Sequence, residues 1–455
     1  MEVKYCIIGA GPTGLGAAHR LRELGQESFL VLEKNAHPGG LSASFTDPAG
    51  FTWDLGGHVL FSHYPYFDRL VEDLLAGDFL EHQRESWVRA QGTWVPYPFQ
   101  NNIRYLPPAD RWECVRGLLP GRRPEGPPAN FRDWIECVFG RGIADIFMLP
   151  YNFKVWATPP ERMDFSWIGE RVSVVDLEGV LKNILLERDD VGWGPNNTFR
   201  FPLRGGTGEI FRRLAARVED KVRFGADVVR VDAAARSVTT ADGEVVRYGT
   251  LLNTGPLDLL VRRWLADPEP ELLEAAADLE HNGVHVSGLG FDSERRDSRC
   301  WMYFPGPETP FYRLTNFHNY SPHNPPGPGL AALMCETSFS EHKPEDLSGI
   351  LARSEEGLAA CGLLSPQERG AMRTRWQMHV DYGYPVPGLS RDRALAAIQP
   401  RLEARGLFSR GRFGGWKYEA GNMDHSVMQG VEWAERMVQD RPERTYTLEH
   451  HGHAR

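Results

Sequence analysis

The beginning of the chain alternates between short apolar runs and glycine-rich turns. Residues 4–8 form an apolar run with the length of a buried strand, and residues 15–24 repeat apolar side chains at helical spacing. Gly25 ends this helical pattern, and a second apolar run at 29–33 predicts the next strand. Strand, helix and strand in this order predict a βαβ unit with its two strands parallel in one sheet.

The turn between the first predicted strand and the helix carries glycines at positions 9, 11 and 14. In a βαβ unit, Gly9 permits the tight turn, Gly11 lets a pyrophosphate approach the backbone, and Gly14 lets helix and strand pack closely. The helix N-terminus adds unpaired N–H groups that favour phosphate. Glu33, at the end of the second strand, is placed to accept hydrogen bonds from ribose hydroxyls. A purely structural turn is the alternative, and the strand, helix and acid around it favour a dinucleotide site.

A second glycine stretch follows the strand that ends at Glu33. It contains Gly39, Gly40 and Leu41. The first turn alone allows NAD as well as FAD. Tandem glycines at this second point let the chain pass close to an extended flavin cofactor, so the sequence predicts FAD.

The remaining patterns divide the chain into strand-rich and helix-rich parts. We expect helices over 107–188, with breaks at 120–128 and 159–160. Strands are expected at 222–231, followed by a hairpin turn at 241–244. Strands and turns are expected over 281–385, and a helix at 424–434. The break at 120–128 is rich in Gly, Pro and Arg, which predicts a mobile, exposed loop. The end of the chain from Asp440 is expected to be a frayed, solvated terminus.

Composition limits the classes of function. The chain has 455 residues and a net charge of −10, which argues against a general nucleic-acid binder and against membrane insertion, and no apolar run has the length of a membrane span. The six cysteines are scattered, and the opening residues leave no room for a signal peptide, so we expect a cytoplasmic protein. Any anionic ligand needs locally concentrated arginines, because the overall charge repels it.

From residue 51 the sequence becomes far more distinctive. The stretch FTWDLGGHVLFSHY at 51–64 resembles the UDP-galactopyranose mutases, in particular their eukaryotic-type branch. The likeness continues, in order, at 94–102, 147–156, 167–172, 194–202, 310–313, 319–322 and 411–422. These blocks span almost the whole chain, so chance does not explain them. After Pro325 the chain is shorter than the eukaryotic-type enzymes. A homo-oligomer is compatible with the resemblance, but the number of subunits is not implied.

The resemblance implies a fold of the amine-oxidase/glutathione-reductase flavin type. This is an α/β architecture with a Rossmann-like FAD-binding domain, a helical substrate domain and a β-sheet domain. The expected boundaries are 1–90, 200–280 and 400–440 for the discontinuous FAD-binding domain, 105–195 for the helical domain, and 91–104 with 281–399 for the sheet domain.

A UDP-sugar has three parts, and the resemblance assigns residues to each. The uridine is expected against aromatic and amide side chains, namely Phe99, Gln100, Phe147, Asn152 and Trp156. On their own, the aromatic members of this set read more simply as core residues, and the amides beside them favour a ring-binding pocket. The diphosphate is expected to pair with Arg171 and Arg313 and to accept hydrogen bonds from Tyr320 and Tyr418.

The third part, the hexose, is expected beside the flavin. Asn196, Trp301 and Tyr303 match positions near the sugar, while Gly57, His58, Arg412 and Asn422 match positions that contact the flavin. His58 is interpreted as a flavin-contacting, redox-sensitive residue and not as an assured general base. With Arg171 and Arg313 it forms the predicted catalytic set.

The activity implied by the resemblance is the interconversion of UDP-galactopyranose and UDP-galactofuranose. Reduced flavin N5 displaces UDP to form a covalent flavin–sugar adduct, and the ring reopens and closes with no net redox change. NADPH or NADH is the expected reductant. The alternatives left open are a mutase for another nucleotide sugar, an FAD-dependent amine oxidase-type enzyme, and a non-catalytic UDP-sugar or flavin sensor. No metal is expected.

Overall fold

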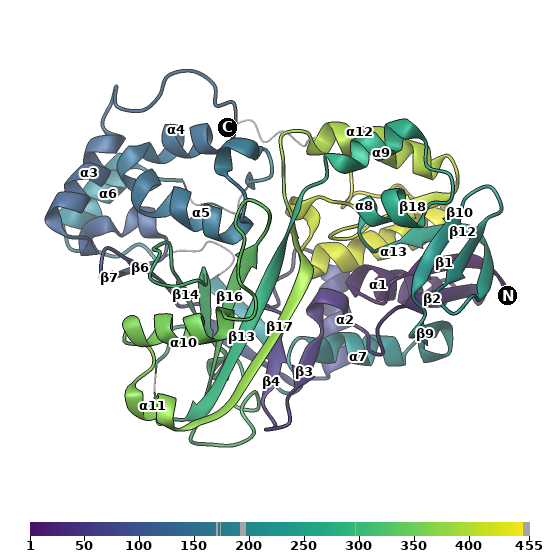
Figure 1. Ribbon diagram of the computed structural model, residues 1–455, viewed down its shortest axis with the longest axis horizontal. Coiled ribbons are helices and arrows are strands. Elements are labelled where there is room, and N and C mark those ends of the chain that lie inside the picture. Colours follow the sequence, from purple (N-terminus) through teal and green to yellow (C-terminus); the bar gives the residue numbers. More distant parts are fainter. Residues whose placement is uncertain (170–171, 173, 192–196, 296, 449–455) are drawn as a thin grey trace.

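The computed structural model describes residues 1–169, 172, 174–191, 197–295 and 297–448 (Figure 1). Two sheets of seven strands each dominate this part of the chain, and a group of helices lies beside the second sheet. Among the described residues, no helix is both long enough and apolar enough to cross a membrane.

The first sheet is built around parallel strands. Its order is β10-β11-β12-β1-β2-β9, with β18 added in parallel to β12. Its strands are β1 (Glu2–Ile8), β2 (Phe29–Glu33), β9 (Val222–Phe224), β10 (Val228–Asp232), β11 (Ser237–Thr240), β12 (Val245–Asn253) and β18 (Leu407–Ser409). Successive β1 side chains enter different cores, Ile7 on one face and Ile8 on the other, as the two-residue period of a strand requires.

Helices cover both faces of this sheet. On the face of Ile7 lie α1 (Pro12–Glu23), α2 (Pro65–Leu75), α7 (Gly208–Ala216) and α13 (Met423–Gln439). On the face of Ile8 lie α8 (Leu257–Leu259), α9 (Pro270–Ala277) and α12 (Arg391–Glu403). This layering is the expected one for a sheet whose central strands are apolar on both sides.

The predicted βαβ unit and hairpin are confirmed. Strand β2 covers 29–33 as expected, and the turn at 241–244 joins β11 to β12. Helix α1 begins at Pro12, three residues before the predicted start, because proline suits the first helical position. The predicted helix at 424–434 lies within α13, which runs five residues further.

The second sheet is mostly antiparallel and has the order β17-β13-β16-β15-β14-β6-β7. Its strands are β6 (Ser86–Ala90), β7 (Thr93–Pro96), β13 (His281–Asp292), β14 (Trp301–Tyr303), β15 (Arg313–Asn316), β16 (Leu330–Phe339) and β17 (Met372–Pro385). Two short pairs complete the strands: β3 (Ser44–Thr46) with β4 (Thr52–Asp54), and β5 (Phe79–Gln83) with β8 (Thr198–Pro202).

One expectation for 281–385 is wrong. The segment contains α10 (Ile350–Ala360) and α11 (Pro366–Gly370) as well as strands and turns. Ile350, Ser354 and Leu358 are all buried, and their four-residue spacing places them on one face of α10. That face covers the outer side of the second sheet, which strands alone would leave exposed to water.

The helical group is α3 (Pro108–Leu118), α4 (Phe131–Ile143), α5 (Leu149–Trp156) and α6 (Leu177–Leu185). The predicted break at 120–128 is confirmed as an exposed loop between α3 and α4, and the break at 159–160 follows α5. The domain boundaries remain a proposal, with one refinement: because β6 lies in the second sheet, we assign 86–90 to the sheet domain.

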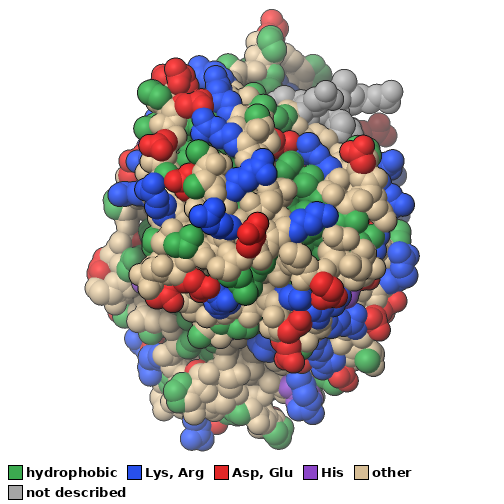
Figure 2. Space-filling model, turned by 90° about the vertical axis from the view of Figure 1, so that its right-hand side faces the viewer, with side chains coloured by type: hydrophobic (Ala, Val, Ile, Leu, Met, Phe, Trp, Pro, Cys, Tyr) green, Lys and Arg blue, Asp and Glu red, His purple; other side chains and the backbone are tan. Residues whose placement is uncertain are grey.

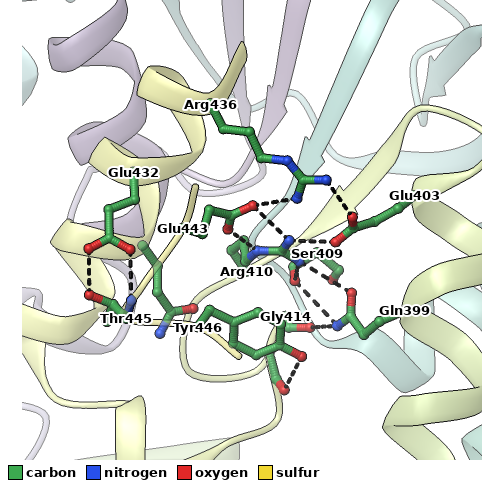
Figure 3. A network of polar contacts seen from close by, with 12 residues as sticks. Gln399, Glu403, Ser409, Arg410, Gly414, Glu432, Arg436, Glu443, Thr445 and Tyr446 are labelled. Atoms are coloured by element: carbon green, nitrogen blue, oxygen red, sulfur yellow. Dashed lines mark hydrogen bonds and ion pairs between the residues drawn. The ribbon is translucent and has the colours of Figure 1, made fainter. Parts of the chain in front are cut away.

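The end of the described chain is packed, so the prediction of a frayed terminus from Asp440 is wrong for residues 440–448. Tyr446 is buried, and its hydroxyl donates to the carbonyl oxygen of Gly415 at 3.1 Å. Glu443 accepts from both Arg410 and Arg436, as Figure 3 shows. This segment returns along α13 and is held there by charge pairs and an aromatic anchor.

Candidate active site

A cavity of about 1300 Å³ is lined by residues of both sheets. Its wall begins at the β1–α1 turn and Glu33 and continues past Gly57 and His58 to Arg313 on the second sheet. Pockets for drug-sized ligands hold about 300–1,000 Å³, so this cavity has room for a longer ligand or for two ligands end to end.

The two glycine stretches meet at one end of the cavity. The N–H of Gly39 donates to the carbonyl oxygen of Ala10 at 2.8 Å. A Cβ on Gly11 would find its nearest neighbour at the Cα of Gly40, 3.9 Å away, so both backbones are open to the cavity. Gly14 lies behind them, where a Cβ would be 1.9 Å from the carbonyl oxygen of Gly9. The structure therefore brings these predicted residues together, with Gly9, Gly11, Gly40 and Leu41 on the wall.

Glu33 stands at the cavity wall with its carboxylate fixed. Oε2 accepts from the N–H of Ala10 at 2.7 Å, and Oε1 accepts from the backbone and side-chain nitrogens of Asn35, both at 2.8 Å. Each carboxylate oxygen has further acceptor capacity. Glu33 is thus able to receive hydroxyl donors from a ligand at this end.

Two helix N-termini point into the same region. Helices α1 and α13 pack closely because a glycine lies at their contact: a Cβ on Gly430 would be 2.0 Å from the carbonyl oxygen of Thr13. Asn422, which precedes α13, lines the cavity, and Arg412 beside it donates to the carbonyl oxygen of Gly421 at 3.0 Å. Two positive helix ends suit the phosphates of a dinucleotide.

The loop at Gly56 and Gly57 presses flat against the second sheet. A Cβ on Gly57 would be 2.6 Å from Oγ1 of Thr315 and 2.8 Å from Nε1 of Trp301. His58 follows and lines the cavity, half-buried. Burial lowers the pKa of His58 to about 4, although the charge of Glu336 opposes this. The imidazole is therefore neutral at pH 7.

Arg313, on β15, places a guanidinium at the cavity wall. Its Nε and Nη2 donate to the two carboxylate oxygens of Glu336, each at 2.6 Å. Burial raises the pKa of Glu336, but the guanidinium more than compensates, so the net shift is downward. Within the described part of the chain Nη1 of Arg313 has no acceptor. The arginine is oriented by two groups and has the third available for a ligand.

Arg84, another of the arginines that line the cavity, was missed by the sequence reasoning. Its guanidinium carbon lies 4.3 Å from the centre of a Trp301 ring, and burial lowers its pKa. Three tyrosines, Tyr97, Tyr303 and Tyr320, lie close enough to influence that pKa. No motif marks Arg84 in the sequence; it lies between β5 and β6, and its backbone N–H donates to the carbonyl oxygen of Asn197 at 2.8 Å.

The predicted uridine residues lie behind the cavity wall and not on it. Phe99 and Phe147 pack ring to ring at 4.8 Å in the core, and the side-chain nitrogen of Asn152 donates to the carbonyl oxygen of Met148 at 2.7 Å. Trp156 packs edge-on against Tyr418 at 4.8 Å, and Gln100 is buried. Of the described residues in this set, none lines the cavity.

Only some of the other residues predicted to bind the substrate line the cavity. Trp301 and Tyr418 line the cavity, whereas Tyr303 and Tyr320 are buried next to it. Tyr303 packs against Tyr97 at 5.5 Å. Arg171 and Asn196 lie outside the described residues. The positions of these side chains are therefore compatible with a polar ligand between the sheets. They do not define the part of the cavity wall to which Arg171 and Asn196 are expected to belong.

Comparison with known proteins identifies the architecture. The family of flavin-containing amine oxidoreductases matches residues 12–438. A crystal structure of reduced UDP-galactopyranose mutase has 45% sequence identity and a TM-score of 0.94, covering 98% of this chain and 96% of that one. The chain belongs to the flavin-containing amine oxidoreductases, among the UDP-galactopyranose mutases.

More distant relatives share the fold. A putrescine oxidase structure matches with 16% identity and a TM-score of 0.66, covering 96% of this chain and 99% of that one. The FAD-dependent oxidoreductase dpchF of Colletotrichum higginsianum is 23% identical over 350 residues, which is 72% of this chain and 68% of that protein. The flavin fold and the FAD cofactor expected from the sequence are confirmed by the family. The apposed glycine turns, the fixed Glu33 carboxylate and the two helix N-termini fit this cofactor.

Proposed function

We propose that this protein interconverts UDP-galactopyranose and UDP-galactofuranose. The observation that carries the proposal is Arg313, held by Glu336 with Nη1 available, in the same cavity as the loop of Gly57 and His58. The reaction separates a sugar from a diphosphate, so it needs a fixed cation where negative charge develops. The close match to a mutase over nearly the whole chain supports the same assignment.

The chain's own residues would orient the UDP-sugar against the cofactor and neutralise the charge of its diphosphate. Arg313 would pair with the diphosphate through Nη1, and Arg171 is proposed as its partner on the basis of the resemblance alone. His58, neutral at pH 7, would contact the cofactor without adding a charge. Trp301 and Tyr418 would form apolar walls that limit water at the sugar. Reduced FAD supplies the nucleophile for the anomeric carbon when bound.

The remaining features of the proposal concern the setting. The six cysteines are all free thiols, which supports a cytoplasmic location. On the face shown in Figure 2, basic side chains are interspersed with acidic ones, and the net charge is −10, which supports a protein without a nucleic-acid partner. NADPH or NADH is proposed as the reductant.

The test is turnover with a defined redox state. The purified protein is incubated with UDP-galactofuranose, with and without dithionite, and conversion to UDP-galactopyranose is followed by chromatography. We expect conversion only after reduction. A flavin-loaded, reducible protein that does not convert this substrate would refute the proposal. Oxygen consumption with putrescine, read in parallel, would instead indicate an amine oxidase.

A further inference from the structure

Glu336 lines the cavity beside Arg313, although no functional motif includes it. It is the only charged residue of strand β16, whose ten residues are otherwise neutral, and its side chain is 2% exposed. Oε1 accepts from the N–H of Gly57 at 3.0 Å and from Nε of Arg313 at 2.6 Å. Oε2 accepts from Nη2 of Arg313 at 2.6 Å and from the hydroxyl of Tyr312 at 2.9 Å.

These four hydrogen bonds join two parts of the site that the sequence separates widely. Gly57 belongs to the loop that carries His58, and Arg313 lies on the second sheet. Both donate to one and the same oxygen, so a displacement of either donor alters the acceptor that the other one uses. Because side-chain packing cannot hold a glycine, the carboxylate is what fixes this loop to the sheet at Gly57.

Stability alone is a weak reason for such an arrangement. A buried ion pair often contributes little to stability compared with an apolar pair of the same volume, because removing two charges from water is costly. The bidentate geometry does, however, fix the direction of a guanidinium. Here it engages Nε and Nη2 and leaves Nη1 of Arg313, a residue that lines the cavity, without an acceptor among the described residues.

We propose that Glu336 is a positioning residue, which holds Arg313 and the Gly57–His58 loop in one rigid frame. The inference rests on the proposed function, since it concerns the diphosphate clamp of that reaction. Glu336 lines the cavity, but both of its carboxylate oxygens are engaged by donors of the protein. It acts through Arg313, so that the cation and the cofactor-facing loop keep a fixed separation during turnover.

The first test is Glu336→Gln, which keeps the shape but removes the charge and turns one acceptor into a donor. We expect kcat of the reduced enzyme to fall at least tenfold, with FAD still bound. Glu355→Gln is the matched control, because Glu355 is also a buried carboxylate paired with arginines but lies on α10. The control is expected to stay within twofold of the unmodified enzyme. An active unmodified enzyme with Glu336→Gln also within twofold would overturn the inference.

The second test asks whether Glu336 acts through Arg313. In an Arg313→Ala background, Glu336→Gln is expected to lower kcat/KM by much less than it does in the unmodified enzyme, because Arg313 is already gone and only the hydrogen bond to Gly57 is left to lose. A full multiplicative loss in the double variant would overturn the inference. If Glu336→Gln does not retain FAD, Tyr312→Phe decides: it removes one donor to Oε2, and we expect kcat to fall about threefold with the Kd for UDP unchanged. An unchanged kcat there would count against the inference.

The outcomes separate the two proposals. If the unmodified, reduced and flavin-loaded protein has no mutase activity, the proposed function fails. If it is active and either the single or the double variant gives the contrary result, only the role of Glu336 fails.

Discussion

Replacing Arg313 by alanine is the sharpest perturbation of the proposed site. The guanidinium of Arg313 is oriented by two hydrogen bonds of 2.6 Å to Glu336, and the residue lines the cavity. A charge pair about 4 Å apart at an effective dielectric constant near 20 is worth about 4 kcal/mol. Loss of one such group in other enzymes costs about 2.7–4 kcal/mol. We therefore expect kcat to fall by about 100- to 1,000-fold in Arg313→Ala.

The variant also has a cost in stability that has to be separated from catalysis. Without Arg313, the buried carboxylate of Glu336 loses two of its four hydrogen bonds and its counter-charge. Breaking a buried pair on one side costs about 3–5 kcal/mol. The double variant Arg313→Ala/Glu336→Gln removes the stranded charge, so we expect its Tm to exceed that of Arg313→Ala while kcat stays equally low.

The assay is single-turnover conversion of UDP-galactofuranose by dithionite-reduced enzyme, with flavin absorbance as the measure of loaded protein. Arg373→Ala is the control, because Arg373 pairs with Asp292 on an exposed stretch of β17. It is expected to turn over normally. A rate for Arg313→Ala within threefold of the unmodified enzyme, at saturating substrate and full flavin content, would refute the reasoning.

Three further predictions concern other parts of the molecule. The pKa of His58 is lowered to about 4, below its value near 6.5 in the unfolded chain, so its contribution to stability is present above about pH 6.5 and is lost as pH falls to 4. Histidine NMR should find the His58 ring neutral at pH 5.5, and a protonated ring would contradict this. Gly14→Ala should abolish FAD retention, read as the ratio of flavin to protein absorbance, because its Cβ would lie 1.9 Å from a carbonyl oxygen, whereas Gly327→Ala in open space should not. Glu443→Gln should lower the free energy of unfolding by about 2 kcal/mol, since it removes one of the two carboxylates that pair with buried Arg410 and leaves only Glu403. The exposed Arg441→Ala should change it by less than about 0.5 kcal/mol in denaturant titrations. Equal effects would contradict the packed terminus.

Local patterns predicted the cofactor half of the molecule well, for a physical reason. The turn at Gly9, the strand ending at Glu33 and the second glycine stretch are each defined by neighbours in the chain, so spacing alone carries their meaning. Helix α10 was missed because its apolar stripe contains a serine and a glycine and its flanks resemble turns. The terminus at 440–448 was missed because Tyr446 gains its packing from residues far away in the sequence.

The predicted substrate side of the cavity is built by contacts between segments far apart in the sequence. This explains why sequence reasoning did not find Arg84 and Glu336. Arg84 is held between β5 and β6 by a backbone hydrogen bond to Asn197, which is distant in the sequence, and nothing within its own segment marks it. Glu336 did leave one signal: a lone carboxylate in a ten-residue neutral strand has to be paired when buried. The pairing itself could not be inferred: the resemblance had singled out Arg313 for the diphosphate, and only the register of β15 against β16 sets it beside Glu336.

The arrangement around Glu336 also bears on why a redox fold can host a reaction with no net redox change. Putrescine oxidase and this chain share the fold at 16% identity, so the glycine turns and helix N-termini that suit the cofactor do not specify the chemistry. What the second sheet adds here is a cation fixed beside the cofactor-facing loop. A fixed cation favours departure and return of an anionic group and offers nothing to an amine substrate, which would itself be positively charged. On the proposed function, we expect the specificity to depend on Arg313 of β15 and Glu336 of β16, and replacing these two residues should affect turnover far more than flavin binding.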